Sequence, residues 1–157
     1  MPRMYTVVDE NRAYATSDGD VDILELDAAT DLPIELVGLK IHVLTEIQEA
    51  QEEWLRFKII RGHTTSGNGT AATPRPVSPA DAAASFAAEV YGATIASAGT
   101  AVDLDAFGVQ VRAGMQDIYP EGCSFWTSGS SLLVVRLMAA AADALNYTLS
   151  AYVREYP

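Results

Sequence analysis

The alternation of apolar and polar residues along short segments constrains this chain more than any other feature. In residues 39–43, Leu39, Ile41 and Val43 share one parity, whereas Lys40 and His42 share the other. Successive side chains of a strand point to opposite faces, so this period predicts a half-buried antiparallel strand. The segments predicted to be strands are "VDILELD", "LVGLKIHVL", "WLRFKII", "AFGVQVRA", "LLVVRL" and "LNYTLSAYV".

Clusters of Gly, Pro, Asp and Ser separate these segments, as in "SDGD", "YPEG" and "SGSS". Seven to nine short strands with such turns predict an antiparallel β-sandwich that resembles a jelly roll, with long loops. A chain of 157 residues has the length of one domain, so we expect residues 1–157 to form a single sandwich. Residues 1–14 mix apolar and charged side chains and could form an arm that docks on another chain.

Two segments have features of a helix. Residues 45–55, "TEIQEAQEEWL", have apolar residues at helical spacing but lie between two predicted strands, so we expect an acidic loop with at most one helical turn. Ser78 and Pro79 are suited to the N-cap and first position of a helix, which predicts a short helical turn there. The following "FAAEVY" is compatible with a strand.

The chain is strongly acidic, with 21 Asp and Glu against 10 Lys and Arg and a net charge of −11. This balance argues against nucleic acid and against an anionic membrane surface as partners, because both require basic residues. An acidic surface can dock on a basic partner, or it can simply keep the protein in solution. A single cysteine, Cys123, excludes an intramolecular disulfide.

Residues 62–79 form the longest stretch of Thr, Ser, Gly, Ala and Pro, and they predict a long loop between two strands. The spacing from Gly62 to Gly67 matches the start of a phosphate-binding P-loop, but Asn68 stands where that motif requires lysine. His63 could act as a general base only with an orienting carboxylate and a nucleophile, which a sequence cannot show. The loop is therefore expected to touch a neighbouring protein.

The sequence contains no recognisable catalytic, cofactor-binding or metal-binding set, and we expect a protein that is not an enzyme. Two histidines and one cysteine do not supply the ligands of a zinc site, and the acidic clusters do not match a calcium loop. Trp54 and Trp126 could stack on sugars, or they could lie in the core or in an interface.

The segments "LRFKIIRGHTTSGNGTAATPRPVSPADAAA", "SAGTAVDLDAFGVQVRAG" and "SSLLVVRLMAAAADALNYTLSAYVREY" resemble small virion structural proteins of tailed phages and prophages. The resemblance covers roughly Leu55 to Tyr156. It implies a cement or decoration protein on the outer capsid surface, in a virion assembled in the cytoplasm of a bacterial host. The alternative is a carbohydrate- or receptor-binding sandwich of a tail fibre or spike.

The resemblance implies the major capsid protein as partner, with no cofactor, no nucleic acid and no membrane. We also expect a homo-oligomer, with a trimer favoured by analogy and a dimer left open. The candidate contact residues are Tyr5, Trp54, Arg61, His63, Thr64, Thr65, Asn68, Arg75 and Trp126.

Overall fold

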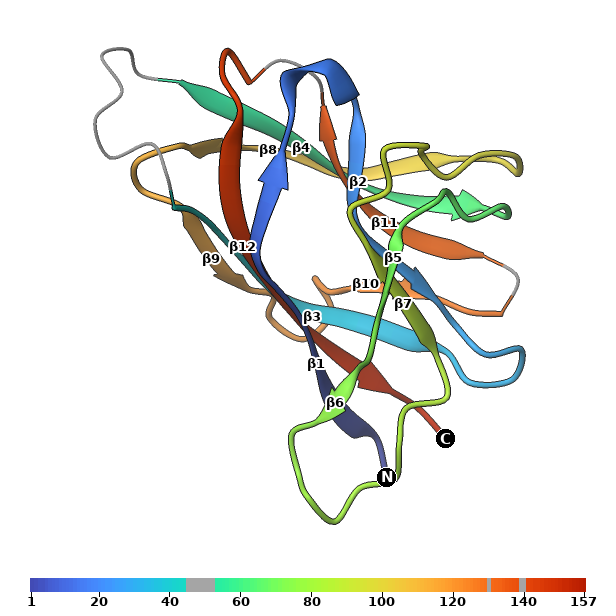
Figure 1. Ribbon diagram of the computed structural model, residues 1–157. Helices are drawn as coiled ribbons and strands as arrows, with labels where there is room; N and C mark the ends of the chain where they lie inside the picture. Colours follow the sequence, from blue (N-terminus) through green and yellow to red (C-terminus); the bar gives the residue numbers. More distant parts are fainter. Residues whose placement is uncertain (45–52, 130, 139–140) are drawn as a thin grey trace.

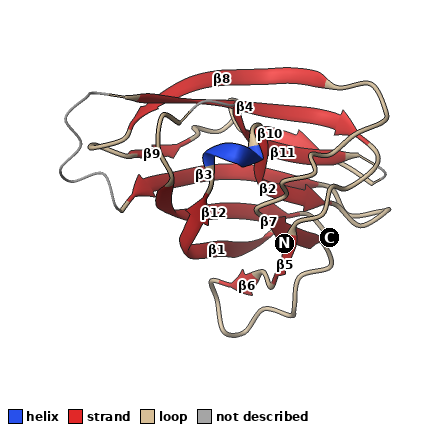
Figure 2. Cartoon of the chain, turned by 45° about the horizontal axis from the view of Figure 1, so that its top comes forward, coloured by secondary structure: helices blue, strands red, loops and turns tan. Residues whose placement is uncertain are grey.

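The computed structural model describes residues 1–44, 53–129, 131–138 and 141–157. The chain forms two antiparallel sheets packed face to face, so the prediction of an all-β sandwich is confirmed (Figure 1). Each segment that was predicted to be a strand overlaps one. A single 3-10 turn, Thr16–Asp18, is the only helix among the described residues (Figure 2).

Sheet A has the strand order β10-β3-β12-β1-β6, and β9 also pairs with β3. Its strands are β1 (Arg3–Tyr14), β3 (Ile34–Val43), β6 (Arg75–Pro76), β9 (Met115–Ile118), β10 (Phe125–Thr127) and β12 (Leu145–Glu155). Sheet B has the order β5-β7-β2-β11-β4-β8. Its strands are β2 (Val21–Asp27), β4 (Trp54–His63), β5 (Thr70–Ala72), β7 (Ala87–Val90), β8 (Val102–Gln110) and β11 (Leu132–Met138).

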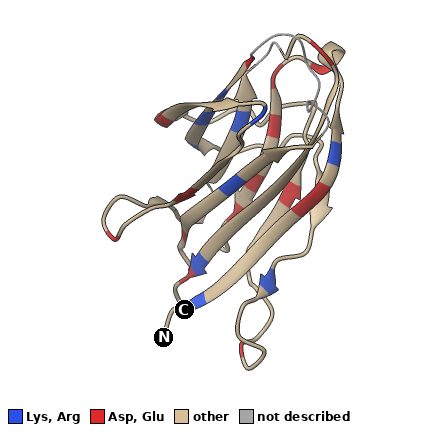
Figure 3. Cartoon of the chain, turned by 90° about the vertical axis from the view of Figure 1, so that its left-hand side faces the viewer, with Lys and Arg blue, Asp and Glu red and all other residues tan. Residues whose placement is uncertain are grey.

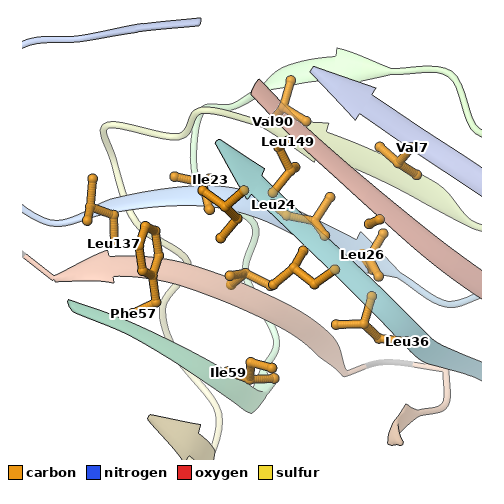
Figure 4. Close-up of a cluster of buried hydrophobic side chains, with 14 of the residues drawn as sticks. Val7, Ile23, Leu24, Leu26, Leu36, Phe57, Ile59, Val90, Leu137 and Leu149 are labelled. Carbon is orange, nitrogen blue, oxygen red and sulfur yellow. The ribbon is translucent and has the colours of Figure 1, made fainter. Parts of the chain in front are cut away.

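The core lies between the two sheets, and β12 shows how the sequence period builds it. Every second residue of β12, from Leu145 to Glu155, is buried, and the residues between them are half-buried. The buried residues Leu149 of sheet A and Ile23 and Phe57 of sheet B belong to one continuous cluster (Figure 4). Removing this apolar surface from water is the main stabilising term of the fold.

The middle strands of sheet B are buried on both faces, which explains why "VDILELD" and "LLVVRL" alternate poorly. Residues 91–101 cross the outer face of this sheet and form bridges from Gly92 to Asp22 and from Ser97 to Thr65. Beneath them lies a second apolar cluster that includes Ile60 and Val134. Sheet B therefore has a covered outer face, in addition to its face toward the core.

A buried ion pair holds the covering segment in place. Nε of Arg136 on β11 donates to Oδ1 of Asp22 on β2 at 2.5 Å, and Nη2 donates to Oδ2 at 3.1 Å. The backbone N–H of Ala96 donates to Oδ2 of Asp22 at 2.6 Å, and Nη2 of Arg136 donates to the carbonyl oxygen of Ala96 at 3.2 Å. Asp22 is fully buried, so these bonds replace the water that its charge has lost.

The prediction of a docking arm over residues 1–14 is wrong. These residues contain β1, which pairs with β12 from Arg3 to Tyr14, with one bulge near Asn11. Tyr5 is fully buried, and its hydroxyl donates to the carbonyl oxygen of Ala82 at 3.1 Å. Its side chain is therefore not available to a partner, and the prediction of Tyr5 as a contact residue is also wrong.

The prediction of a helical turn at Ser78 is wrong as well. Residues 78–81 form a tight turn in which the N–H of Asp81 donates to the carbonyl oxygen of Ser78 at 3.1 Å, and no helix follows. The expected loop over residues 62–79 is interrupted by β5 and β6. The predicted acidic loop falls mostly on residues 45–52, which lie outside the described residues; Trp54 and Leu55 at its end belong to β4.

Replacing Arg136 by alanine should destabilise the protein by about 3–5 kcal/mol, because the buried charge of Asp22 loses its partner. The double variant Asp22→Leu, Arg136→Met should recover only part of this loss, because it removes both charges and fills the space but leaves the N–H and the carbonyl oxygen of Ala96 without these partners. Urea unfolding followed by circular dichroism measures both free energies. An Arg136→Ala protein that unfolds at the wild-type urea concentration would show that the pair does not stabilise the fold.

Candidate functional site

The segment that follows β4 is anchored to the sandwich by Glu25 of β2. Ser66 donates from Oγ to Oε2 of Glu25 at 2.8 Å, and its Oγ lies 3.0 Å from Oε2 of Glu89 on β7. The N–H of Gly67 donates to both carboxylate oxygens of Glu25 at 3.2 Å. A Cβ at Gly67 would overlap the carbonyl oxygen of Thr94, so the close approach requires glycine. This part of the predicted contact loop is packed against the fold.

The loop residues predicted to contact a partner make internal bonds. Nδ1 of His63 lies 3.2 Å from the carbonyl oxygen of Ala98, and its Nε2 lies 3.5 Å from Nη2 of Arg136. Asn68 accepts the N–H of Thr94 at Oδ1 at 2.8 Å. Thr64 and Thr65 are exposed, and both backbone N–H groups donate to the carbonyl oxygen of Ser97, at 3.3 and 3.0 Å. The structure therefore gives these residues a role in holding residues 91–101.

Arg75 is exposed on β6 and lines a hollow of about 330 Å³ at the edge where β1 lies near β5. Arg12 also lines this hollow, but its guanidinium is bound to Asp9 by two bonds of 2.8 and 2.9 Å. Arg75 pairs with Thr6 of β1 in sheet A, whereas Thr64 and Thr65 are bonded to Ser97, so the loop does not gather the predicted contacts into one site.

The first exposed surface of interest lies on the outer face of β4 and β8. Trp54 is 62% exposed, and its ring lies against Gly108, where a Cβ would come within 3.2 Å of Cε3. Arg56 and Lys58 alternate with buried residues along β4 and so share the face of Trp54. We call the surface formed by Trp54, Arg56, Lys58, Ala106 and Gly108 the Trp54 face.

A hollow of about 460 Å³ lies on this surface and is lined in part by Arg56, Lys58, Gly108 and Met138. Lys58 is paired with Asp103 of β8 at 2.6 Å. Basic residues are outnumbered by acidic ones and are spread over several strands (Figure 3). The Trp54 face therefore stands out, because two basic side chains lie there beside an exposed tryptophan.

The second exposed surface lies where one end of β10 meets sheet B. A hollow of about 380 Å³ is lined by Pro33, Arg61, Trp126, Thr127, Ser128 and Ser131, and we call it the Trp126 hollow. Arg61 reaches it from β4 and donates from Nη1 to the carbonyl oxygen of Trp126 at 3.1 Å. Trp126 is 39% exposed.

Sequence reasoning named both tryptophans and Arg61 but missed their neighbours. Arg56 and Lys58 could have been found, because they share the parity of Trp54 in a well-predicted strand. Pro33, Ser128 and Ser131 carried no signal, since they lie in turns that only the packing of sheet A on sheet B brings together.

Among the described residues, no group of three or more His, Cys, Asp or Glu side chains could hold a metal ion. Cys123 is exposed. None of the described residues forms a helix with the length and hydropathy required to cross a membrane.

Comparison with known proteins gives no match to a family model, to a curated protein or to a solved structure.

The carboxylate of Glu25, which accepts bonds from Ser66 and Gly67, should make the free energy of unfolding depend on pH. Burial raises the pKa of the Glu25 carboxyl, and the charges of Asp22 and Glu89 add to this rise, whereas the bonds from Ser66 and Gly67 oppose it. Between the ordinary glutamate pKa of about 4.3 and the raised value, the folded chain binds more protons than the unfolded chain. The free energy of unfolding should therefore fall as pH increases through this window.

Glu25→Gln should remove this fall, because glutamine keeps the acceptor oxygen without a titrating group. Ser66→Ala should steepen it, because the ionised carboxylate loses a donor. Urea unfolding between about pH 4 and pH 8 measures the slope for each protein. Identical slopes for the wild type and Glu25→Gln would contradict the assignment.

Proposed function

We propose that this chain is a non-enzymatic virion structural protein, a cement or decoration protein that binds the outer surface of a phage capsid and stabilises capsomers of the major capsid protein. The resemblance over Leu55 to Tyr156 supports this function. The packed loops also support it, because a protein that bridges subunits on a shell needs a rigid body with preorganised contact surfaces.

The observation that carries the proposal is the exposure of Trp54 beside Arg56 and Lys58 on the outer face of β4. Tryptophan and arginine are the residues most enriched among the energetic centres of protein interfaces, because they bury a large area and still make polar contacts. Gly108 and Ala106 opposite them leave a depression that a projecting side chain of a partner can enter.

The charges of this face indicate which surface of a partner would complement it. Lys58 forms an ion pair with Asp103, whereas Arg56 adds a further positive charge to a chain of net charge −11. An acidic or carbonyl-rich patch on the capsid subunit would complement this face, and the acidic remainder of the chain would repel incorrect orientations. The site of action is then the capsid surface, after assembly in the bacterial host cytoplasm.

The alternative function is a carbohydrate- or receptor-binding module of a tail fibre or spike. One observation favours it: Trp126 is exposed in a hollow that also contains an arginine and several hydroxyl groups. The gene neighbourhood distinguishes the two functions, since a cement gene is expected beside the major capsid gene and a fibre module beside tail genes.

Trp54→Ala should weaken binding to capsids by roughly 10- to 100-fold, because truncating an anchor residue costs about 2 kcal/mol or more. Co-sedimentation of labelled protein with capsids from the same genome measures this change, and Trp126→Ala is the matched control with unchanged binding. Wild-type protein that does not co-sediment would refute the cement function. Unchanged binding of Trp54→Ala would refute only the docking face.

The cement function also includes a homo-oligomer, with a trimer favoured at three-fold positions of the shell. Sedimentation equilibrium should give a mass of three times 16.8 kDa for the isolated protein at micromolar concentration. A mass of twice this value would replace the trimer by a dimer, and a single protomer at all concentrations would contradict self-association.

A further inference from the structure

The Trp126 hollow combines features that the Trp54 face lacks. It lies at the junction of the two sheets, with Arg61 from β4 of sheet B and Trp126 from β10 of sheet A. Its volume of about 380 Å³ lies within the range of small-molecule sites. Pro33 lies in the turn before β3, and Ser128 and Ser131 lie between β10 and β11.

The tryptophan is held in one orientation. Its ring stacks on Tyr156 with the ring centroids 4.6 Å apart and an angle of 28° between the planes. The Tyr156 hydroxyl donates to Oε2 of Glu35 at 2.6 Å, and Nη1 of Arg154 donates to the same oxygen at 3.0 Å. One face of the indole is thus fixed against the protein, which leaves the other face for a ligand without a large loss of side-chain entropy.

The polar groups around the ring are positioned, and the described residues do not satisfy all of their hydrogen-bonding capacity. Arg61 donates one Nη1 bond to the carbonyl oxygen of Trp126, and a guanidinium has five N–H donors in total. Thr127 is buried, and its Oγ1 donates to the carbonyl oxygen of Ser131 at 2.7 Å. The hydroxyl groups of Ser128 and Ser131 line the hollow beside Arg61.

The charge in the hollow is positive. Among the described residues that line it, Arg61 is the only charged one, and the acid on the neighbouring strand, Glu35, is 2% exposed and paired with Arg154. In a chain of net charge −11, a pocket whose described lining has an arginine and no carboxylate favours a negatively charged group on the ligand.

We propose that the Trp126 hollow is a binding site for an acidic sugar, a pyranose ring that carries a carboxylate. The apolar face of the ring stacks on the free face of Trp126, beside Pro33. The carboxylate accepts hydrogen bonds from the Arg61 guanidinium, and the ring hydroxyls bond to Ser128 and Ser131. This site deepens the alternative carbohydrate-binding function and rests on it, and it does not depend on capsid docking, because it uses a different tryptophan on a different sheet.

The two tryptophans provide an internal control for the test. Each indole N–H gives one signal in a ¹H–¹⁵N correlation spectrum, and single Trp→Phe variants assign the two signals. Titration with methyl glucuronide up to about 20 mM, a range suited to a millimolar Kd, should shift the Trp126 signal in a saturable manner. The Trp54 signal should not move. Methyl glucoside, the neutral analogue, should bind at least about tenfold more weakly, because it lacks the carboxylate.

Variants separate stacking from charge recognition. Trp126→Ala should weaken binding of the glucuronide about tenfold or more, and Trp126→Tyr should retain most of it, because a ring is kept. Because Trp126→Ala removes the indole, its binding is measured by calorimetry. Arg61→Gln should abolish the preference for the acidic sugar but leave a folded protein, as judged by circular dichroism. Trp54→Ala is the matched control and should bind like the wild type.

The proposal is overturned if neither sugar shifts the Trp126 signal, or if both signals shift linearly without saturation. Equal affinity for the acidic and the neutral sugar would overturn the assignment of Arg61 as the carboxylate ligand. Loss of glucuronide binding in Trp54→Ala would place the sugar on the other tryptophan and would also contradict the site. None of these results bears on capsid binding, which is measured separately with Trp54→Ala.

Discussion

The ion pair between Asp22 and Arg136 is the interaction on which the outer layer of this protein depends. It lies on the face of sheet B opposite the core, and the backbone of Ala96 completes its hydrogen bonds. An uncovered pair at this position would be hydrated and would contribute little. Because residues 91–101 cover it, the pair must be satisfied internally, and it fixes that segment on the sheet.

Residues 91–101 cover part of the outer face of sheet B and so limit where a partner could bind. The segment after β4 is bound to residues 91–101 through Thr65 and Asn68, and to the sheet through Ser66 and Gly67. Binding surfaces are left on the outer face of β4 and β8 and at the junction near β10. Trp54 and Arg61 are seven residues apart on β4, which is about 23 Å along an extended strand. The two proposed binding surfaces are therefore spatially distinct.

Much of the fold could be predicted from the sequence because alternation is a local property. The residues of β12 alternate so regularly that their buried face follows from parity alone. The sequence does not show that residues 1–14 form a strand, because Val8 lies on the exposed face of β1 and the acidic Asp9 on its buried face, and a bulge near Asn11 interrupts the pairing. Of the two surfaces, Trp54 and Trp126 could be named from the sequence as candidate contact residues, although their exposure could not, and Pro33, Ser128 and Ser131 could not be named at all.

By itself, the sequence determined the all-β class, the positions of β2, β3, β4, β8, β11 and β12, and the acidity of the chain, whereas short strands such as β5, β6, β9 and β10 were not predicted. Only the tertiary structure decided that Tyr5 is buried, that His63 and Ser66 have internal partners, and that Arg61 meets Trp126. The physical reason is that side-chain parity is set between adjacent residues, whereas burial of a polar group depends on which distant segment covers it. Asp22 and Arg136, for example, are buried only because the distant segment that contains Ala96 packs over them and bonds to both.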